Sequence, residues 1–292
     1  MYKWLGLSKQ AVSAMFKRKE QKEVEAQKLL EAAEALRKHH PGMGCRKMSY
    51  LLKQQGWGRD KIEVLLLREG YRVVHHPNKF KTTHSVRFHN YRNLIEGKKI
   101  ADINQVVQSD ITYYLVGGKT YYLVFIIDIY SKRIVGYRAS ENMEAISNQK
   151  ALEQMIALRG VANLNRLIHH SDRGSQYHSH AYVERLKSCK IRISMCIESW
   201  ENAYSERINR TIKEEYLDYW NIKNFDELKR GVKKAVQNYN EHRPHWNLNL
   251  QTPIAFEQNI KNIPMTKRKK ISIYKKKEES SPHKNTNAIE KK

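Results

Sequence analysis

The chain has 292 residues, and its 54 Lys and Arg exceed its 30 Asp and Glu to give a formal net charge of +24. This length predicts about two domains and leaves room for a sizeable core. The positive charge is spread along the chain and favours nucleic acid as a partner, although ribosomal and membrane-surface proteins are also basic. Cys45, Cys189 and Cys196 are too few and too scattered for a disulfide framework or a zinc site.

The sequence contains no apolar segment long enough for a signal peptide or a membrane span. Its longest apolar run covers 121–127 and ends at Asp128, whereas a spanning helix needs about 20 apolar residues. We therefore expect a soluble intracellular protein with three reduced, buried cysteines.

The N-terminal region, 1–74, is predicted to be helical and to bind DNA. Its expected helices cover 20–38, 43–54 and 60–69. Asp60 and Glu63 have the spacing of a capping box, which predicts the start of the third helix. Two short helices around a glycine-bearing turn in a basic segment indicate a helix-turn-helix, and a plain helical hairpin fits the pattern about as well.

From residue 103 the sequence changes to the β-branched and aromatic runs that are typical of strands. Gly117-Gly118 separates the first two runs and predicts a hairpin. The expected strands cover 103–116, 119–130, 133–139, 165–171 and 190–195, and the expected helices cover 143–158, 178–188, 202–220 and 225–241. This order predicts an α/β domain in which helices flank a mixed five-stranded sheet.

Two further segments are predicted to have little regular structure. Residues 75–100 are basic and polar with little periodicity, and we expect them to form a linker that lies on DNA. The segment 261–292 has eleven Lys and Arg against three Glu. It is expected to be a disordered tether that binds phosphates without sequence preference.

Three carboxylates lie among basic residues at positions that favour a shared site. Asp110 is on the first predicted strand, Asp172 follows the fourth, and Glu206 is one turn into a predicted helix. Carboxylate oxygens are the ligands that Mg²⁺ prefers, and such ions beside a polyanion indicate chemistry at phosphate groups. Any one of the three, judged alone, would be an ordinary surface acid.

The strings around these acids resemble one protein family. They are HHSDRGSQY (169–177), ENAYSERINRTIKEEYL (201–217) and YNEHRPHWNLNLQTP (239–253). They resemble the catalytic subunit, often called OrfB, of the IS-three group of bacterial insertion sequences, over about residues 40–258 of the chain. The resemblance implies a ribonuclease H-like catalytic core, as in retroviral integrases, over 101–260.

The resemblance also assigns roles to single residues. It implies that Asp110, Asp172 and Glu206 form the catalytic triad and hold two Mg²⁺ ions, for which Mn²⁺ can substitute. It implies that Lys213 contacts the transposon end. The other predicted DNA contacts are Asn209, Arg210, Arg173 and Arg243, and the last of these is alternatively expected to pack at a helix end.

The spacing of the triad departs from the family pattern. Only 33 residues lie between Asp172 and Glu206, about two fewer than is usual in the family. The shortening falls within 194–203, and it leaves open how the loop before the helix meets DNA.

Other candidate residues are expected to have structural roles. Asp128 is predicted to end a strand before a turn, and His169 and His170 to pack at a strand end. Ser175 has no identifiable base and is not expected to be a nucleophile.

The function that the resemblance implies is DNA transposition, in which the enzyme cleaves the 3′ ends of an element and joins them to DNA. The implied partners are terminal inverted repeats, target DNA, further copies in a multimer on DNA, and an upstream OrfA-type protein or fusion. The implied location is the bacterial cytoplasm, near the nucleoid and away from membranes. A DNA-binding relic without activity and a ribonuclease H-like nuclease that cuts without joining remain alternatives.

Overall fold

The computed structural model describes residues 6, 8–53, 56–74, 91–143 and 145–274. Its helices are α1 (Lys9–His39), α2 (Cys45–Leu51), α3 (Arg59–Arg68), α4 (Ala145–Arg159), α5 (His180–Ser188), α6 (Ala203–Glu215), α7 (Phe225–Glu241) and α8 (Pro253–Ile260). Its strands are β1 (Lys99–Ile100), β2 (Val106–Val116), β3 (Lys119–Asp128), β4 (Ile134–Ser140), β5 (Ile168–Ser171), β6 (Arg192–Met195) and β7 (Ile271–Ser272). None of the helices in these ranges is long and apolar enough to cross a membrane.

The strands β2 and β3 form the predicted hairpin. Gly117 and Gly118 both have positive φ angles, 57° and 82°, which a side chain would strain and which a two-residue turn between twisted strands requires. Val116 therefore pairs with Lys119, and the antiparallel register continues to Val107 opposite Asp128.

The main sheet has the order β4-β3-β2-β5-β6. The β2–β3 and β3–β4 pairs are antiparallel, whereas β2–β5 and β5–β6 are parallel. Three antiparallel strands followed by two parallel ones, with helices in the crossovers, make the ribonuclease H-like arrangement. The predicted fold class is therefore confirmed.

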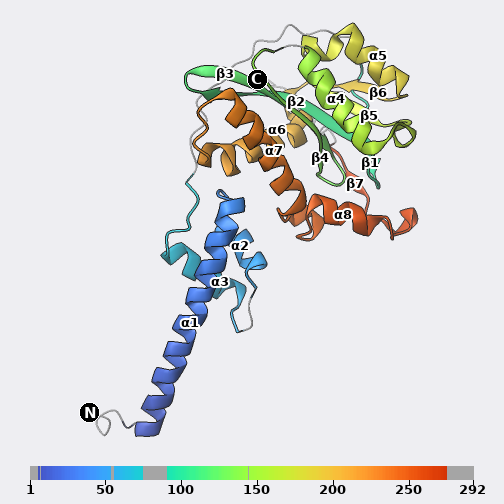
Figure 1. Cartoon of the computed structure of the whole chain (residues 1–292). Coiled ribbons are helices and arrows are strands. Elements are labelled where there is room, and N and C mark those ends of the chain that lie inside the picture. The colour runs from blue at the N-terminus through green and yellow to red at the C-terminus, as the bar shows by residue number, and fades with distance from the viewer. Residues whose placement is uncertain (1–5, 7, 54–55, 75–90, 144, 275–292) are drawn as a thin grey trace, which may run out of the picture.

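Helices cover both faces of this sheet (Figure 1). On one face α4 and α5 pack over a core that includes Val107, Val124 and Leu152. On the other face α6 and α7 pack over a core that includes Phe125 and Ile212. Because side chains alternate along β2, its even-numbered residues, among them Asp110, point toward the α6 side.

The N-terminal region is helical, as predicted, and has a small core of its own around Leu29, Met48 and Ile62. The first helix is longer than expected because Ser8 caps it, accepting a hydrogen bond from the backbone N–H of Ala11 at 3.1 Å. The predicted capping box of the third helix is wrong, since Gly58 is the N-cap and makes no side-chain cap bond. In Figure 1, α1 extends away from the sheet domain, with α2 and α3 beside it.

The chain segment after α1 attaches this region to the sheet domain. The backbone N–H of Gly42 donates to the carbonyl of Glu215 at 2.9 Å, at the last turn of α6. The Asn238 amide donates to the carbonyl of His39 at 2.7 Å, and the His40 ring lies 3.0 Å from the Tyr216 hydroxyl. The two regions are thus joined through the end of α6.

The predicted linker and tail differ from the structure where they are described. Residues 91–100 are packed, with Ile95 and Ile100 fully buried, and β1 pairs antiparallel with β7. The prediction of disorder is wrong for 261–274, where apolar side chains such as Ile273 pack into a further core with Ile95, Ile100 and Ile260. The remainder of both predicted segments, 75–90 and 275–292, lies outside the described residues.

Replacing Gly42 should weaken the attachment of the N-terminal region. A Cβ atom at this position would lie 2.5 Å from the Glu215 Cα atom, and that backbone cannot move aside cheaply. We expect Gly42→Ser to lower the free energy of unfolding by about 1–3 kcal/mol, as overpacking does. Thermal denaturation measures the loss, and hydrogen exchange at 39–44 locates it.

Gly44→Ser is the matched control, because a Cβ atom there meets nothing within 4 Å and serine is a favoured N-cap for α2. Equal melting temperatures for the two serine variants would contradict the close contact at Gly42.

Candidate active site

Asp110 and Asp172 become neighbours through the parallel pairing of β2 with β5. The register ends with Ser109 opposite Ser171, and each aspartate is the next residue in its segment. Adjacent strands lie about 4.8 Å apart, so the two acids reach the same level of the sheet although 61 residues separate them in sequence. The charge of Asp172 acts directly on Asp110.

Helix α6, which carries Glu206, is fixed to β2 by the side chain of Gln108. The Gln108 Nε2 atom donates to the carbonyl of Glu201 at 3.0 Å. Its Oε1 atom accepts from the backbone N–H groups of Tyr204 and Ser205 at 3.1 and 3.3 Å. Those N–H groups have no partner within the helix, and the N-cap residue makes no side-chain bond to them. The strand therefore caps the helix.

The turn before α6 is ordered, although its segment is shorter than the family pattern. Glu198 and Glu201 form a capping box around the 3₁₀ turn Ser199–Asn202, and Glu201 is fully buried. The Asn202 amide adds a second tie to β2, donating to the carbonyl of Ser109 at 3.1 Å. The segment in which the family spacing is shortened is thus an ordered connection between β6 and the helix.

Further along α6, two predicted DNA-binding residues contact β2. The Asn209 Nδ2 atom donates to the Asp110 Oδ2 atom at 2.7 Å. One turn later, the Lys213 Nζ atom donates to the Thr112 Oγ1 atom at 2.9 Å. Asn209 is 5% exposed, and its side-chain amide supports the Asp110 carboxylate.

The three acids have raised pKa values. Burial, and then the charges of Asp172 and Glu206, raise the pKa of Asp110 well above its ordinary value. Burial also raises the pKa of Asp172, while the N–H of Gly174 opposes this by donating to the carboxylate at 3.1 Å. Burial raises the pKa of Glu206, and Arg210 opposes it. Asp110 is thus the acid on which both burial and the charges of the other two act, whereas Glu206 is exposed.

The carboxylate oxygens of these three acids are suitable ligands for a divalent cation, but the acids do not surround a common point. Within the described ranges, no group of three or more His, Cys, Asp or Glu side chains is close enough together to hold a metal ion. Two observations fit a cation beside Asp110. The carboxylate lies in a field of like charge that a cation would neutralise, and the neighbouring Asn209 Oδ1 atom is buried without a hydrogen-bond partner among the described residues.

The remaining predicted DNA contacts differ in their accessibility. Arg210 is exposed and lies 3.6 Å from the Glu214 carboxylate. Arg173 is 9% exposed, yet its Nε and Nη1 atoms have no partner among the described residues. Arg243 is 7% exposed and makes two bonds to Glu215, at 2.6 and 2.7 Å. The Arg243 guanidinium thus packs against Glu215, the last residue of α6.

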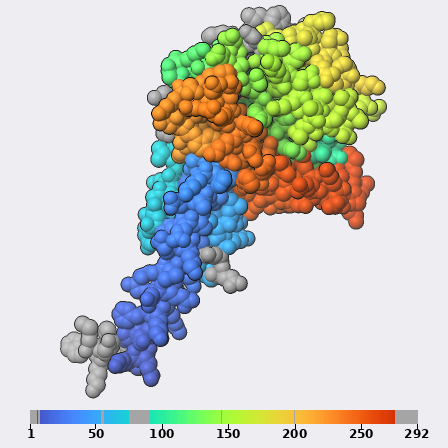
Figure 2. Space-filling view, in the orientation of Figure 1, coloured from blue at the N-terminus to red at the C-terminus, as the bar shows by residue number. Residues whose placement is uncertain are grey.

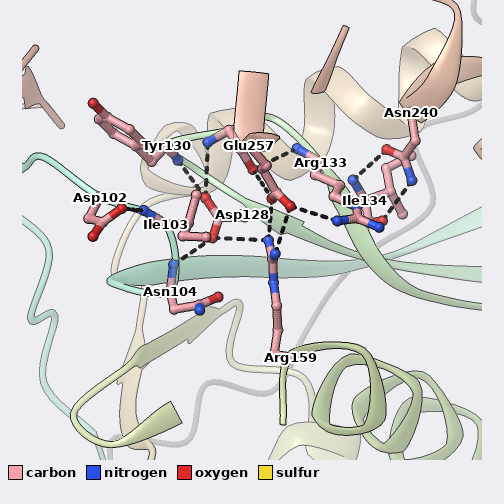
Figure 3. Close-up of polar contacts among 11 residues, drawn as sticks. Asp102, Ile103, Asn104, Asp128, Tyr130, Arg133, Ile134, Arg159, Asn240 and Glu257 are labelled. Carbon is pink, nitrogen blue, oxygen red and sulfur yellow. Dashed lines mark hydrogen bonds and ion pairs between the residues drawn. The ribbon is translucent and has the colours of Figure 1, made fainter. Parts of the chain in front are cut away.

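Asp128, the alternative to Asp110, is part of a buried structural network (Figure 3). Its carboxylate accepts hydrogen bonds from the backbone N–H groups after β3, including that of Tyr130 at 2.9 Å, and from that of Asn104 at 2.8 Å. Arg159 lies 3.5 Å from Asp128 and bonds Glu257 of α8 at 2.5 Å. This confirms that Asp128 ends the strand and stabilises the turn.

The two histidines before Asp172 are also structural. His169 lies 2.9 Å from the Tyr182 hydroxyl and His170 lies 2.8 Å from the Ser194 hydroxyl. Burial lowers the pKa of His169 to about 4 and that of His170 to about 3. Both rings are therefore neutral near pH 7, which agrees with the predicted packing role.

Sequence reasoning missed the residues that position the site, Gln108 above all. One signal was present. Gln108 is a large polar residue two positions before Asp110 in an otherwise β-branched run, so it faces the same side of the sheet. Its partners on α6 could not be read from the sequence.

Comparisons with known proteins identify the family of the chain. Two models of the family described as "Integrase core domain" match residues 102–199 and 187–253. The transposase for insertion sequence element IS629 of Shigella sonnei is 31% identical over 210 residues, which is 70% of each chain. The chain belongs to the insertion-sequence transposases. This confirms the resemblance to the IS-three group and its integrase-like core.

Other relatives match a smaller part of the present chain. A putative transposase for IS986/IS6110 of Mycobacterium tuberculosis is 37% identical over 119 residues, or 39% of this chain and 43% of the relative. Among solved structures, the HTLV-2 integrase catalytic core domain in complex with magnesium is 21% identical with a TM-score of 0.43. It covers 57% of this chain and 99% of that one.

Neutralising Asp110 should stabilise the transposase at neutral pH. A carboxyl whose folded-state pKa is raised destabilises the fold as pH rises from its ordinary value of 3.8 through the raised value. We expect Asp110→Asn to melt about 2–4 °C higher at pH 8, a gain of about 1 kcal/mol, and to show little gain at pH 4.

Thermal denaturation of both proteins across this pH range, with and without Mg²⁺, measures the effect. Mg²⁺ should raise the melting temperature of the unmodified protein more than that of the variant. Asp226→Asn removes an exposed acid that pairs with Lys229 and should bring no gain. If the difference in melting temperature between Asp110→Asn and the unmodified protein stayed constant with pH, the charge of Asp110 would not destabilise the fold.

Removing the Gln108 side chain should loosen α6. Gln108→Ala leaves two backbone N–H groups and one carbonyl without their partner, and each such buried group costs about 1–3 kcal/mol. We expect lower stability and faster hydrogen exchange in 201–206. Gln237→Ala, on the exposed face of α7 where the side chain bonds only Glu241, is the control. Unchanged exchange in 201–206 would mean that the glutamine does not hold the helix.

Proposed function

We propose that this transposase cleaves the 3′ ends of an insertion element and joins them to DNA, with Asp110, Asp172 and Glu206 as its catalytic carboxylates. The observation that carries the proposal is that the charges of Asp172 and Glu206 both act on Asp110. The β2–β5 register and the capping of α6 by β2 bring their separate segments to one end of the sheet. The integrase-core matches and the IS629 relative support the reaction class.

The three acids are proposed to hold divalent cations, Mg²⁺ or Mn²⁺. When bound, such ions stabilise charge at the scissile phosphate and lower the pKa of water. The protein prepares the carboxylates for this role. Asn209 holds one oxygen of Asp110 and Gly174 holds one oxygen of Asp172, which fixes the orientation of both carboxylates.

Cationic side chains beside the acids are proposed to bind the phosphates of the element end. Lys213 is on the same helix as Glu206 and reaches β2 two residues beyond Asp110. Arg210 is exposed, and Arg173 has unpartnered donors. Contacts of this kind fix the register of DNA without reading its sequence. We therefore propose that recognition of terminal inverted repeats needs a multimer and an upstream OrfA-type partner.

Neutralising one proposed catalytic acid should remove activity without removing DNA binding. In Glu206→Gln we expect at least about a 100-fold loss of excised circular junctions, because the carboxylate acts on the reacting phosphate. Affinity for duplex DNA should stay within about twofold, since Lys and Arg contacts supply it. Amplification of circle junctions from a plasmid carrying the element with its flanking DNA measures the first, and gel shifts at fixed salt measure the second.

Glu214→Gln is the matched control, because Glu214 lies on the same helix and pairs with Arg210. Asp172→Asn should behave like Glu206→Gln. Near-normal circle formation by either acid variant would refute the proposed triad. Magnesium-dependent nicks without junctions, from the unmodified protein, would favour a nuclease, and neither product, even with the upstream frame supplied in trans, would favour an inactive relic.

A further inference from the structure

A cavity of about 620 Å³ lies on the side of α6 that faces away from Asp110. Its walls come from α6, from the segment after α7, from β3 and the turn after it, and from Lys47 of α2. Glu206 lines it, so the cavity opens beside the proposed active site. The volume is within the ~300–1,000 Å³ range of sites for small ligands. Figure 1 shows α2 below the domain that contributes the other walls.

The cavity is strongly cationic. Five cationic side chains line it against the single carboxylate of Glu206: Lys47, Lys132, Arg207, Arg210 and Arg243. Arg243 and Arg210 have carboxylate partners. Lys47, Lys132 and Arg207 have none within the described ranges. The Lys132 ammonium donates to the Ile129 carbonyl at 2.5 Å and lies 4.0 Å from the Tyr204 ring centroid, contacts that leave its positive charge without a carboxylate.

Burial disfavours the charged form of two of these lysines, and a bound anion would offset this penalty. Burial, and then the nearby Arg243, lower the pKa of Lys47 to about 8. Burial also lowers the pKa of Lys132 to about 8, with a further contribution from Arg207. A bound phosphate would favour the charged form of both lysines.

Aromatic side chains line the same cavity. Trp246 is 47% exposed and is held by an edge contact with Tyr50 of α2, with ring centroids 5.1 Å apart at 88°. The edge contact leaves a face of the indole ring open. Tyr204 and Tyr239 form other parts of the wall. Open aromatic faces beside cations are the means by which proteins bind single-stranded nucleic acid, since every base can stack.

We propose that this cavity binds an unpaired nucleotide of the DNA substrate, with its phosphate against Lys47, Lys132 and Arg207 and its base on Trp246. The inference rests on the proposed function, because it makes the nucleotide a part of the DNA that Glu206 acts on. A concave site of this size admits a single nucleotide and excludes the width of a duplex. Lys47 and the support of Trp246 both come from α2, so the site is complete only when the N-terminal region is docked.

Binding of labelled oligonucleotides to the full chain, in EDTA and at fixed salt, tests this without catalysis. The probes are an eight-residue oligothymidylate and a duplex of equal charge, followed by fluorescence anisotropy. We expect Trp246→Leu and Lys47→Gln to weaken single-strand binding at least about tenfold, the size of one base–aromatic stack, and to change duplex binding less than twofold. Trp246→Phe should restore most of the loss.

Two control variants separate this site from the general surface charge. Trp200→Leu removes an equally exposed tryptophan (45%) that packs on Tyr274 outside the cavity, and Lys229→Gln removes an exposed lysine of α7. Neither should affect single-strand binding. Equal losses for both probes in the cavity variants, or no loss for either, would overturn the proposal.

The proposed triad can fail separately from the nucleotide site. Asp172→Asn should bind the oligothymidylate normally even though it forms no circles. Suppose that Asp172→Asn forms no circles and that Trp246→Leu binds the oligothymidylate as well as the unmodified protein does. The proposed triad would then stand, and the nucleotide site would be rejected. Thermal denaturation confirms that each variant is folded.

Discussion

The capping of α6 by the Gln108 side chain is the interaction on which the site depends. A helix start leaves backbone N–H groups unsatisfied, and here a residue of β2, the central strand of the sheet, satisfies two of them. The bond joins the strand that carries Asp110 to the helix that carries Glu206. The parallel register of β5 adds Asp172 to the same place. Three separate segments are thus aligned by hydrogen bonds among buried groups, which tolerate little displacement.

Charge is distributed unevenly in this basic protein. The chain carries +24 overall, yet Asp110 is under the charges of two other acids, Asp172 and Glu206. Other buried cations form ion pairs with carboxylates. Arg159 pairs with Asp128 and Glu257, and Arg243 pairs with Glu215. Two buried cations near the acids differ from these: Lys132, in the cavity beside Glu206, and Arg173, next to Asp172, have no carboxylate partner among the described residues. Unpaired buried charge is costly, and a site for a polyanion is one setting that repays it.

The N-terminal region contributes to the same area through the end of α6. Gly42 allows its backbone to bond the last turn of that helix, and His40 and Asn238 secure the contact. One helix therefore connects the docking of the N-terminal region, the cavity wall and the proposed catalytic glutamate.

By itself, the sequence determined the elements and the residue types of the site. The β-branched and aromatic runs around Gly117-Gly118 predicted a hairpin with the observed turn, and the helix predicted over 225–241 has the limits of α7, because these signals act within a few residues. The strings around Asp110, Asp172 and Glu206 pointed to one family. Only the tertiary structure decided which side chains meet. Gln108 caps a helix some 95 residues away, Asn209 turns inward to Asp110, and the segment after 261 pairs with β1. Such contacts arise from packing between distant segments, which local patterns do not encode.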